Sequence, residues 1–439
     1  MSRRAVVTGM GCVTPVGHTR TQIWDHLTEG RSGIGRLTVF DASRYPIRIA
    51  AEVKDWDLSD VGLDPHRWTG APRQTAFAIG SALKAFRESG LDQGGYDPTR
   101  FGVYLGCGEP FEDFARFTDS ICCARDAGDY QPQGFLNGAL RLFDPDIEVE
   151  YEPDMPSFHI AGLVNAQGPI LNAIAACVSS TQSIGEAARM IRRGHADVML
   201  CGGAHSTINE FGVTGFQRLS ALSTRDCDPA EASRPFDLDR DGFVIGEGGA
   251  AFIVEELEHA RARGAEIFGE ITGYGSAQDA YRVTDSHPDG RGAVRALQAA
   301  LNSATLNPDE IDYVNAHGTG TVMNDKVETT ALKRAFGDAI WKIPVSSTKS
   351  VLGHATTGCG AIETAVCLMA IQAGVVPPTT NYSTPDPHCD LDYVPNVARE
   401  WQCRHVVNNS VGFGGQNAAL VISQFDEATP SFSAIRRAA

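Results

Sequence analysis

The 439-residue sequence predicts an α/β protein, because segments with the pattern of buried strands alternate with segments of helical period. Residues 197–203 (DVMLCGG) form a continuous apolar run of strand length, which is typical of a strand buried on both faces. Just before this run, apolar residues recur at the spacing of one helix face, at Ile184, Ala187, Ala188 and Ile191. Gly194 follows and is expected to end this helix.

The other elements follow in chain order. Residues 6–11 (VVTGMG) predict an opening strand that ends in a glycine turn. In the second half of the chain, residues 344–348 predict a strand and residues 360–372 predict a helix. Two closing strands are predicted at 406–410 and 418–423, on either side of a glycine loop at 412–415.

The recurring order of strand, turn and helix predicts two halves of like topology that divide between residues 256 and 264, although the sequence has no clean period. We therefore expect one half over residues 1–258 and a second over 259–427. A short polar tail should follow over 428–439.

Composition excludes several classes of protein. A net charge of −17 argues against nucleic acid as a partner, because phosphate binding needs a basic face. The sequence has no run of 18 apolar residues and no signal peptide, so neither a membrane span nor secretion is expected. Eleven cysteines, an odd number scattered through a long chain, indicate reduced thiols in the cytoplasm. Without a C-x-x-C pair, no metal site is predicted.

The candidate nucleophile is Cys177, in residues 175–181 (AACVSST). Small and hydroxylic residues follow it at the start of the predicted helix, and a helix N-terminus favours a thiolate. The small neighbours also let an acyl chain approach the sulfur closely. A buried structural cysteine is the alternative interpretation, and the cysteine by itself does not exclude it.

Two histidines strengthen the catalytic interpretation. His317 lies in residues 315–321 (NAHGTGT) and His354 ends residues 349–354 (KSVLGH), each in a glycine-containing loop after an apolar run. A single histidine is more often structural than catalytic, but two in this setting are harder to dismiss. A cysteine can hold an acyl group as a thioester, and two neutral imidazoles can donate hydrogen bonds to a second thioester as it loses carbon dioxide.

These three segments, in this order, resemble the β-ketoacyl-[acyl carrier protein] synthases of the two-histidine, elongating type, over roughly residues 3–425. The resemblance implies a thiolase-like fold, with two similar halves in five layers, α-β-α-β-α, in a dimer. It also implies a decarboxylative Claisen condensation between an acyl thioester on Cys177 and malonyl carrier protein, in fatty-acid or polyketide elongation. No cofactor would be bound, because the carrier protein supplies the phosphopantetheine arm.

The resemblance assigns further roles residue by residue. Lys349 matches the active-site lysine, with Asp325 as its carboxylate partner, and Glu363 matches a glutamate that helps to order the site. The backbone N–H groups of Cys177 and Phe413 would form the oxyanion hole, and the Phe413 ring would gate the acyl pocket. The expected pantetheine contacts are Thr284, Thr319 and Thr321.

The chain departs from the family pattern in several places. Residues 106–158 are unlike the housekeeping enzymes in a region that helps to shape the acyl pocket and the dimer contact, so chain length and acyl type stay open. Three single departures are Asp285, Val411 and Gln416. The sequence offers few basic residues for docking the carrier protein; the four candidates are Arg67, Arg73, Arg218 and Arg225.

Two other functions share this fold. A non-catalytic chain-length-factor-like partner subunit is one, although such subunits usually lack the nucleophile that Cys177 supplies. A coenzyme A-dependent thiolase is the other, with Cys359 as a candidate second cysteine, although the two histidines and Lys349 fit the synthases better. The protein could form a homodimer or pair with a chain-length-factor-like subunit.

Overall fold

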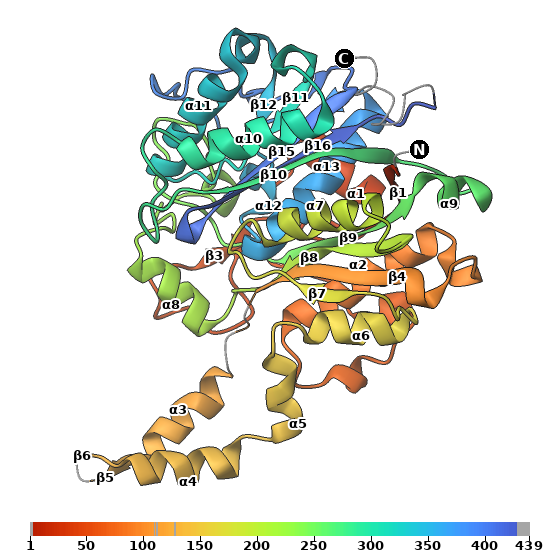
Figure 1. Cartoon of the computed structure of the whole chain (residues 1–439). Coiled ribbons are helices and arrows are strands. Elements are labelled where there is room, and N and C mark those ends of the chain that lie inside the picture. The colour runs from red at the N-terminus through yellow and green to blue at the C-terminus, as the bar shows by residue number, and fades with distance from the viewer. Residues whose placement is uncertain (1–2, 109, 111–112, 127–128, 428–439) are drawn as a thin grey trace.

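A ten-stranded sheet runs through the computed structural model, which describes residues 3–108, 110, 113–126 and 129–427 (Figure 1). In order across the sheet, the strands are β12 (Val345–Ser346), β11 (Tyr313–Asn315), β15 (His405–Gly412), β16 (Gln416–Ser423), β10 (Gly269–Gln278), β1 (Ala5–Val13), β9 (Gly248–Glu256), β8 (Val198–His205), β4 (Phe101–Cys107) and β7 (Ile170–Asn172). Three short pairs lie outside it: β2 (Gly35–Arg36) with β3 (Ile49–Ala50), β5 (Arg125–Asp126) with β6 (Asp129–Tyr130), and β13 (Val375–Val376) with β14 (Arg399–Glu400).

The two halves of this sheet have the same topology. If the five strands of each half are numbered along the chain, both halves lie in the order 3-2-4-5-1. Strand 2 is parallel to strands 3 and 4 in both halves, and strand 5 is antiparallel to its neighbours. An antiparallel contact between β1 and β10 joins the halves. The expectation of two similar halves is therefore confirmed.

The predicted boundary between residues 258 and 259 falls within α9 (Leu257–Ala262), which connects β9 to β10. It remains a prediction, and the predicted tail at 428–439 lies outside the described residues. The remaining α-helices of the described chain are α1 (Arg20–Thr28), α2 (Arg73–Glu88), α3 (Phe114–Cys123), α4 (Pro132–Leu142), α5 (Pro145–Glu148), α6 (Met155–Leu163), α7 (Ser179–Arg192), α8 (Glu210–Arg218), α10 (Arg291–Ala304), α11 (Val322–Phe336), α12 (Lys349–Leu352) and α13 (Cys359–Ala373).

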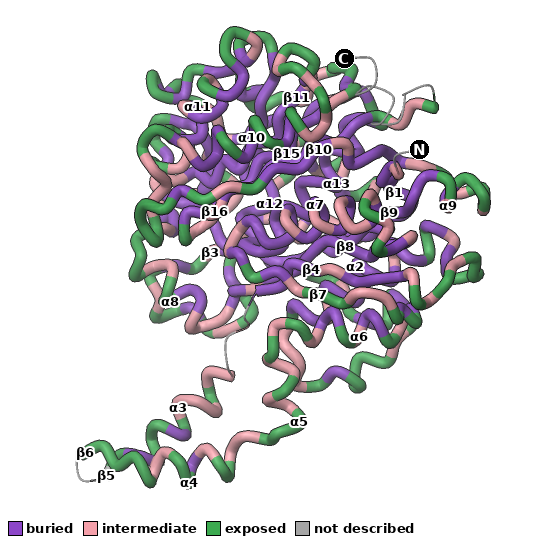
Figure 2. The backbone as a smooth tube through the Cα atoms, in the orientation of Figure 1, coloured by how far each residue is buried: buried purple, intermediate pink, exposed green. Residues whose placement is uncertain are grey.

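Helices complete the layers. Helices α7 and α13 pack between the two halves of the sheet, and Figure 2 shows both as buried segments at the centre of the molecule. Helix α2 covers the outer face of the N-terminal half, and α10 covers that of the C-terminal half. Helix α13 has almost no polar face because every residue from Cys359 to Ile371 is buried.

The opening strand differs from the prediction. Strand β1 does not end in a turn at its glycines but runs on to Val13. A Cβ atom at Gly9 would lie 2.2 Å from the carbonyl oxygen of Ala85, and one at Gly11 would lie 2.1 Å from that of Ser81. The glycines therefore allow helix α2 to pack directly on the strand, a tertiary requirement that looks like a turn signal in the sequence.

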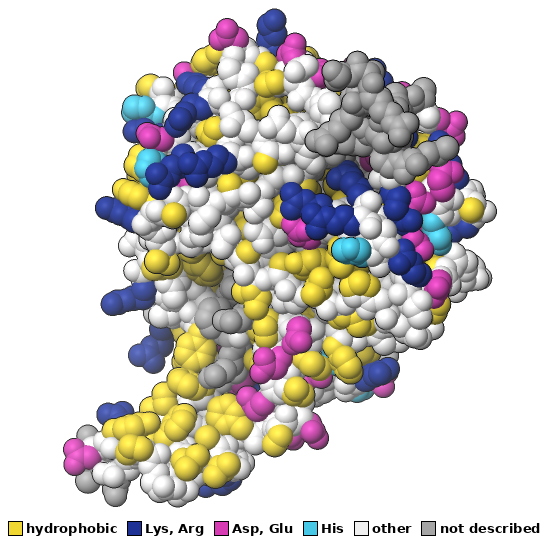
Figure 3. All heavy atoms as spheres, viewed as in Figure 1, with side chains coloured by type: hydrophobic (Ala, Val, Ile, Leu, Met, Phe, Trp, Pro, Cys, Tyr) yellow, Lys and Arg dark blue, Asp and Glu magenta, His cyan; other side chains and the backbone are white. Residues whose placement is uncertain are grey.

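The atypical region forms an arm. Helices α3 and α4 pack on each other and project away from the body of the protein (Figure 1). Few of their side chains are buried, and Figure 3 shows apolar side chains along the arm and over the neighbouring surface. Among the described residues, no helix is long and apolar enough to cross a membrane.

Candidate active site

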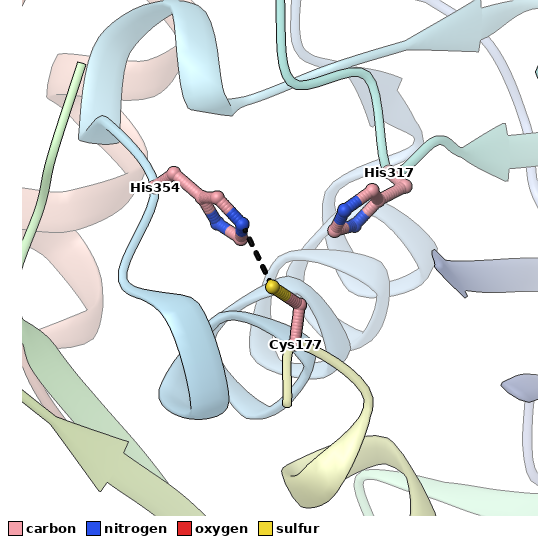
Figure 4. Close-up of side chains that lie close together, drawn as sticks. All are labelled: Cys177, His317 and His354. Atoms are coloured by element: carbon pink, nitrogen blue, oxygen red, sulfur yellow. Dashed lines mark hydrogen bonds between the residues drawn. The ribbon is translucent and has the colours of Figure 1, made fainter. Parts of the chain in front are cut away.

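Three loops bring Cys177, His317 and His354 together, as Figure 4 shows. Cys177 lies between β7 and α7, His317 follows β11, and His354 follows α12. The Cys177 Sγ atom lies 3.1 Å from His354 Nε2, and the two imidazole rings are 5.2 Å apart between centroids. The loops of Cys177 and His317 directly follow parallel strands, β7 and β11, and α12, which precedes His354, comes after the parallel strand β12. Segments at the carboxyl ends of strands from both halves therefore meet at one site.

The backbone is strained next to the thiol and next to His354. Ala176 has φ +50° and Thr356, two residues after His354, has φ +45°, although neither is a glycine. Left-handed backbone is costly for a residue with a Cβ atom, and for a β-branched threonine most of all. Such strain persists where the surrounding fold holds a functional group in place, which fits a site that aims the sulfur and the imidazole at each other.

The expectation of a thiolate at Cys177 is not supported. Burial raises the pKa of the Cys177 thiol to about 11, although the charge of Lys349 and the backbone N–H groups of Phe413 and Cys177 oppose this rise. Desolvation of the sulfur outweighs these opposing contributions. The free enzyme therefore holds a neutral thiol, and His354 is the base within reach of its proton.

We predict that alkylation of Cys177 by iodoacetamide becomes about tenfold faster with each pH unit from pH 7 to 10, because only the thiolate reacts and its fraction stays small below the raised pKa. Peptide mass spectrometry over a pH series, read at Cys177 alone, measures this rate. A rate that levels off below pH 8 would show that the helix N-terminus, rather than burial, controls the sulfur.

Both histidines are neutral at physiological pH. Burial, aided by the charge of Lys349, holds the pKa of His317 and of His354 well below its usual range. A neutral imidazole can donate one hydrogen bond and accept another. The pair can therefore donate to a thioester carbonyl, while His354 can also accept the thiol proton during acyl transfer.

Glu328 holds the His317 loop in place, and sequence analysis missed it. Its carboxylate accepts hydrogen bonds from the backbone N–H groups of His317 and Gly318, each at 2.7 Å, and from Asn409 Nδ2, also at 2.7 Å. All three partners are buried or nearly so. The only available signal was helical spacing, which places Glu328 on α11 one turn after Asn324 and facing the loop.

Replacing Glu328 with glutamine should lower malonyl decarboxylation by about 10- to 100-fold and leave acyl loading of Cys177 nearly unchanged, because the amide cannot accept both backbone N–H groups and the imidazole shifts. Carbon dioxide release and intact mass measure the two half-reactions separately. An equal loss in both would indicate general unfolding instead of a misplaced His317.

The carboxylate partner of Lys349 is Glu363, so the assignment of Asp325 was wrong. Lys349 Nζ donates a short hydrogen bond to Glu363, and each side chain is only 2% exposed. Burial opposes the charge on Lys349, but the nearby acidic groups, Glu363 foremost, together outweigh burial and raise the lysine pKa above its usual range. The ammonium group is therefore kept charged beside the histidines.

Asp325 serves another cation. Its carboxylate lies 3.5 Å from Arg240 Nε and accepts hydrogen bonds from the backbone N–H groups of Phe236 (2.7 Å) and Gly320 (3.2 Å). It therefore holds the base of the loop that carries Thr319 and Thr321. Two buried acids lie one turn apart on α11, and sequence distance could not show which of them faces Lys349.

A cavity of about 260 Å³ opens onto the three reacting groups. The expected pantetheine contacts and gate residue all line it: Thr284, Thr319, Thr321 and Phe413. The Thr319 and Thr321 hydroxyls lie 2.9 Å apart and share a hydrogen bond. Asp285 and Val411, two of the departures from the family pattern, also line this cavity, so they contact whatever enters it.

The four candidate docking cations have different local partners. The Arg73 Nε atom donates to the buried Glu247 carboxylate at 3.0 Å, while the Arg73 side chain stays partly exposed, so its role in docking remains a prediction. Arg225 donates to the backbone carbonyl of Asp239, and Arg67 lies over the Trp68 ring at 5.0 Å. Arg218 is exposed at the end of α8, next to cavity residues 219–221.

Comparison with known families decides the identity. The N-terminal domain of β-ketoacyl synthase matches residues 2–260, and the C-terminal domain matches residues 268–383. The chain belongs to the β-ketoacyl synthase family. The boundary between the two matched segments falls in the connection from β9 to β10, where the two halves of the sheet meet.

Similar sequences come from both branches of acyl-chain elongation. The synthase is 41% identical to 3-oxoacyl-[acyl-carrier-protein] synthase 2 of Synechocystis sp. over 423 residues, covering 96% of this chain and 98% of the relative. It is 39% identical to the tetracenomycin polyketide synthase ketoacyl synthase alpha subunit of Streptomyces glaucescens over 427 residues, covering 96% and 97%.

Solved structures agree on the fold. A β-ketoacyl synthase from Burkholderia phymatum superposes with a TM-score of 0.86 at 31% identity, covering 97% of this chain and all of that one. The ishigamide ketosynthase/chain length factor superposes with a TM-score of 0.84, also at 31% identity, with the same coverage. The expected thiolase-like fold of this synthase is thereby confirmed.

Proposed function

We propose that this synthase condenses an acyl group held on Cys177 with malonyl carrier protein, which lengthens the chain in fatty-acid or polyketide biosynthesis. The observation that carries this proposal is the meeting of one thiol and two neutral imidazoles at a single cavity. The family supports a carrier-protein-dependent condensation, and the geometry gives each residue a role.

Acyl transfer comes first. The Cys177 sulfur attacks the carbonyl of the incoming thioester while its proton passes to His354 Nε2, which lies 3.1 Å away. The carbonyl oxygen becomes negative and accepts hydrogen bonds from the backbone N–H groups of Cys177 and Phe413. The bond to the pantetheine sulfur then breaks, that sulfur takes the proton from His354, and the acyl group remains on Cys177.

Condensation follows. His317 and His354 donate hydrogen bonds to the malonyl thioester carbonyl, so the electron pair of the breaking carbon–carboxylate bond moves into an enolate as carbon dioxide leaves. The enolate carbon attacks the acyl-Cys177 carbonyl, and its oxyanion occupies the same pair of backbone N–H groups. The carbon–sulfur bond breaks, the β-ketoacyl product stays on the carrier protein, and Cys177 leaves as a thiolate that takes one proton from solvent.

The chain itself needs no bound cofactor for these steps, because the reactive thiol of the substrate is carried on a phosphopantetheine arm. Thr284, Thr319 and Thr321 line the cavity and would contact that arm. One structurally similar complex is described as a type II polyketide synthase acyl-carrier protein with its ketosynthase, which supports a carrier protein as the partner here.

The test is a condensation assay with purified acyl carrier protein and malonyl carrier protein. We expect carbon dioxide release and a carrier protein whose mass corresponds to a β-ketoacyl chain two carbons longer. Carrier proteins loaded with a range of acyl lengths would identify the preferred substrate. Decarboxylation without any condensation product would favour a partner subunit, and turnover of coenzyme A thioesters alone would favour a thiolase.

We also propose a partner of the same fold, either a second copy or a chain-length-factor-like subunit. Strand β7 lies at the edge of the sheet and exposes Ile170 and Leu171, with Ile174 close by. The arm adds further exposed apolar side chains, including Leu136 and Leu140. Exposed apolar side chains gathered in this way are typical of a protein interface.

Replacing Leu171 with aspartate should convert a dimer into monomers, because a charge at the edge of the sheet opposes strand pairing and apolar contact. Native mass measured on the purified chain, and on the chain produced with a candidate partner, separates the two kinds of dimer. A matched change of exposed Val283, on the segment after the central strand β10, should leave the mass unchanged. A wild-type monomer in both preparations would contradict the proposal.

All eleven cysteines are free, which supports a reducing compartment, and we place the synthase in the cytoplasm. Cys359 does not support the thiolase alternative. It is buried at the start of α13, donates a weak hydrogen bond to the carbonyl oxygen of Cys177 at 3.4 Å, and does not line the cavity. The complete set of Cys177, His317 and His354 likewise disfavours a non-catalytic subunit.

A further inference from the structure

The reacting groups also form a set of metal ligands. One ligand atom from each of Cys177, His317 and His354 lies within 4.8 Å of the other two. Figure 4 shows the sulfur between the two imidazole rings, and both rings are buried. Thiolate sulfur and imidazole nitrogen are the ligands that Zn²⁺ prefers, and three protein ligands with one open position are typical of an accessible zinc site.

We propose that Cys177, His317 and His354 form a reversible inhibitory site for Zn²⁺, in which the metal competes with the acyl group for the sulfur. Bond lengths to zinc place the ligand atoms of a tetrahedral site about 3.3–3.6 Å apart. Cys177 Sγ and His354 Nε2 are already 3.1 Å apart, so closure of the longer separations by roughly 1 Å completes the geometry. The cavity leaves the fourth position open to water.

The surroundings make this site suited to weak binding. Within the part of the chain that the structure describes, the Nδ1 atoms of His317 and His354 have no hydrogen-bond partner, whereas a tightly bound zinc usually has histidines that are oriented through their second nitrogen. The charged Lys349 also repels a cation. Binding releases the Cys177 proton to solvent and forms a zinc–sulfur bond, so a chelator reverses it and restores the thiol.

Protection from alkylation tests the site without any turnover, so its result is independent of the proposed function. Purified enzyme is treated with zinc chloride, then with iodoacetamide, and each cysteine is read by peptide mass. At a zinc concentration ten times Kd, alkylation of Cys177 should slow roughly elevenfold. Exposed Cys122 and Cys123 serve as internal comparisons, and EDTA should restore the rate.

Cobalt chloride identifies the ligands. Cobalt(II) bound to a thiolate should add sulfur-to-metal charge-transfer absorption, which His317→Gln should weaken and Cys177→Ala should abolish. The matched control, Cys122→Ser with Cys123→Ser, should keep the full absorption. The proposal is overturned if zinc leaves Cys177 alkylation unchanged, or if the absorption survives Cys177→Ala and disappears in the control, which would place the metal on the arm.

Discussion

Replacing Cys177 with alanine should abolish acyl transfer to the protein. After incubation with acyl carrier protein, wild type should gain the mass of the acyl group and the variant should gain none, with condensation reduced at least about a thousandfold. The reason is that, among the described residues, Cys177 is the cysteine that lines the cavity together with both histidines. Intact-mass spectrometry across several acyl lengths measures the effect and shows the preferred chain.

The alanine variant should nevertheless fold and decarboxylate. Losing one sulfur from a half-buried position leaves both histidines, Lys349 and Glu363 in place, so carbon dioxide should still be released from malonyl carrier protein. Cys122→Ala, which removes an exposed thiol on the arm, should acylate like wild type. If Cys177→Ala still gains the mass of the acyl group, another residue is the nucleophile. If folded wild type gains no acyl mass, a partner subunit is missing from the assay.

Breaking the buried pair of Lys349 and Glu363 should have the largest effect on stability. Lys349→Met should lower the free energy of unfolding by about 3–5 kcal/mol, because it leaves an unpaired carboxylate where each side chain of the pair is 2% exposed. It should also slow both half-reactions, since the ammonium group lies beside His317 and His354. Denaturant unfolding measures the first effect and carbon dioxide release measures the second.

Two comparisons separate the pair from a general defect. Lys349→Met combined with Glu363→Gln should recover most of the lost stability but not the activity, because the uncompensated charge is gone and the ammonium group is still missing. Arg261→Ala breaks an exposed ion pair with Glu258 and should cost at most about 1 kcal/mol. A double variant as unstable as Lys349→Met would mean that packing, rather than charge, dominates.

Local patterns in the sequence predicted much of the fold. The helix predicted before residues 197–203 is α7, and the strand itself is β8, because burial on both faces leaves an apolar run that can be recognised without a structure. The helix predicted at 360–372 is α13, Cys359–Ala373. By contrast, the sequence predicted a turn at Gly9 and Gly11, because a close approach of helix and strand requires glycine just as a turn does.

By itself, the sequence determined the α/β class, the two similar halves, and the three segments that supply Cys177, His317 and His354, since these depend on periodicity and on chemistry within short stretches. Only the tertiary structure decided that Lys349 pairs with Glu363 instead of Asp325, and that burial keeps Cys177 as a thiol. It also decided that Glu328, to which Asn409 donates, holds the His317 loop. The physical reason is that charge pairing and desolvation depend on distances between segments far apart in the chain, which no local pattern contains.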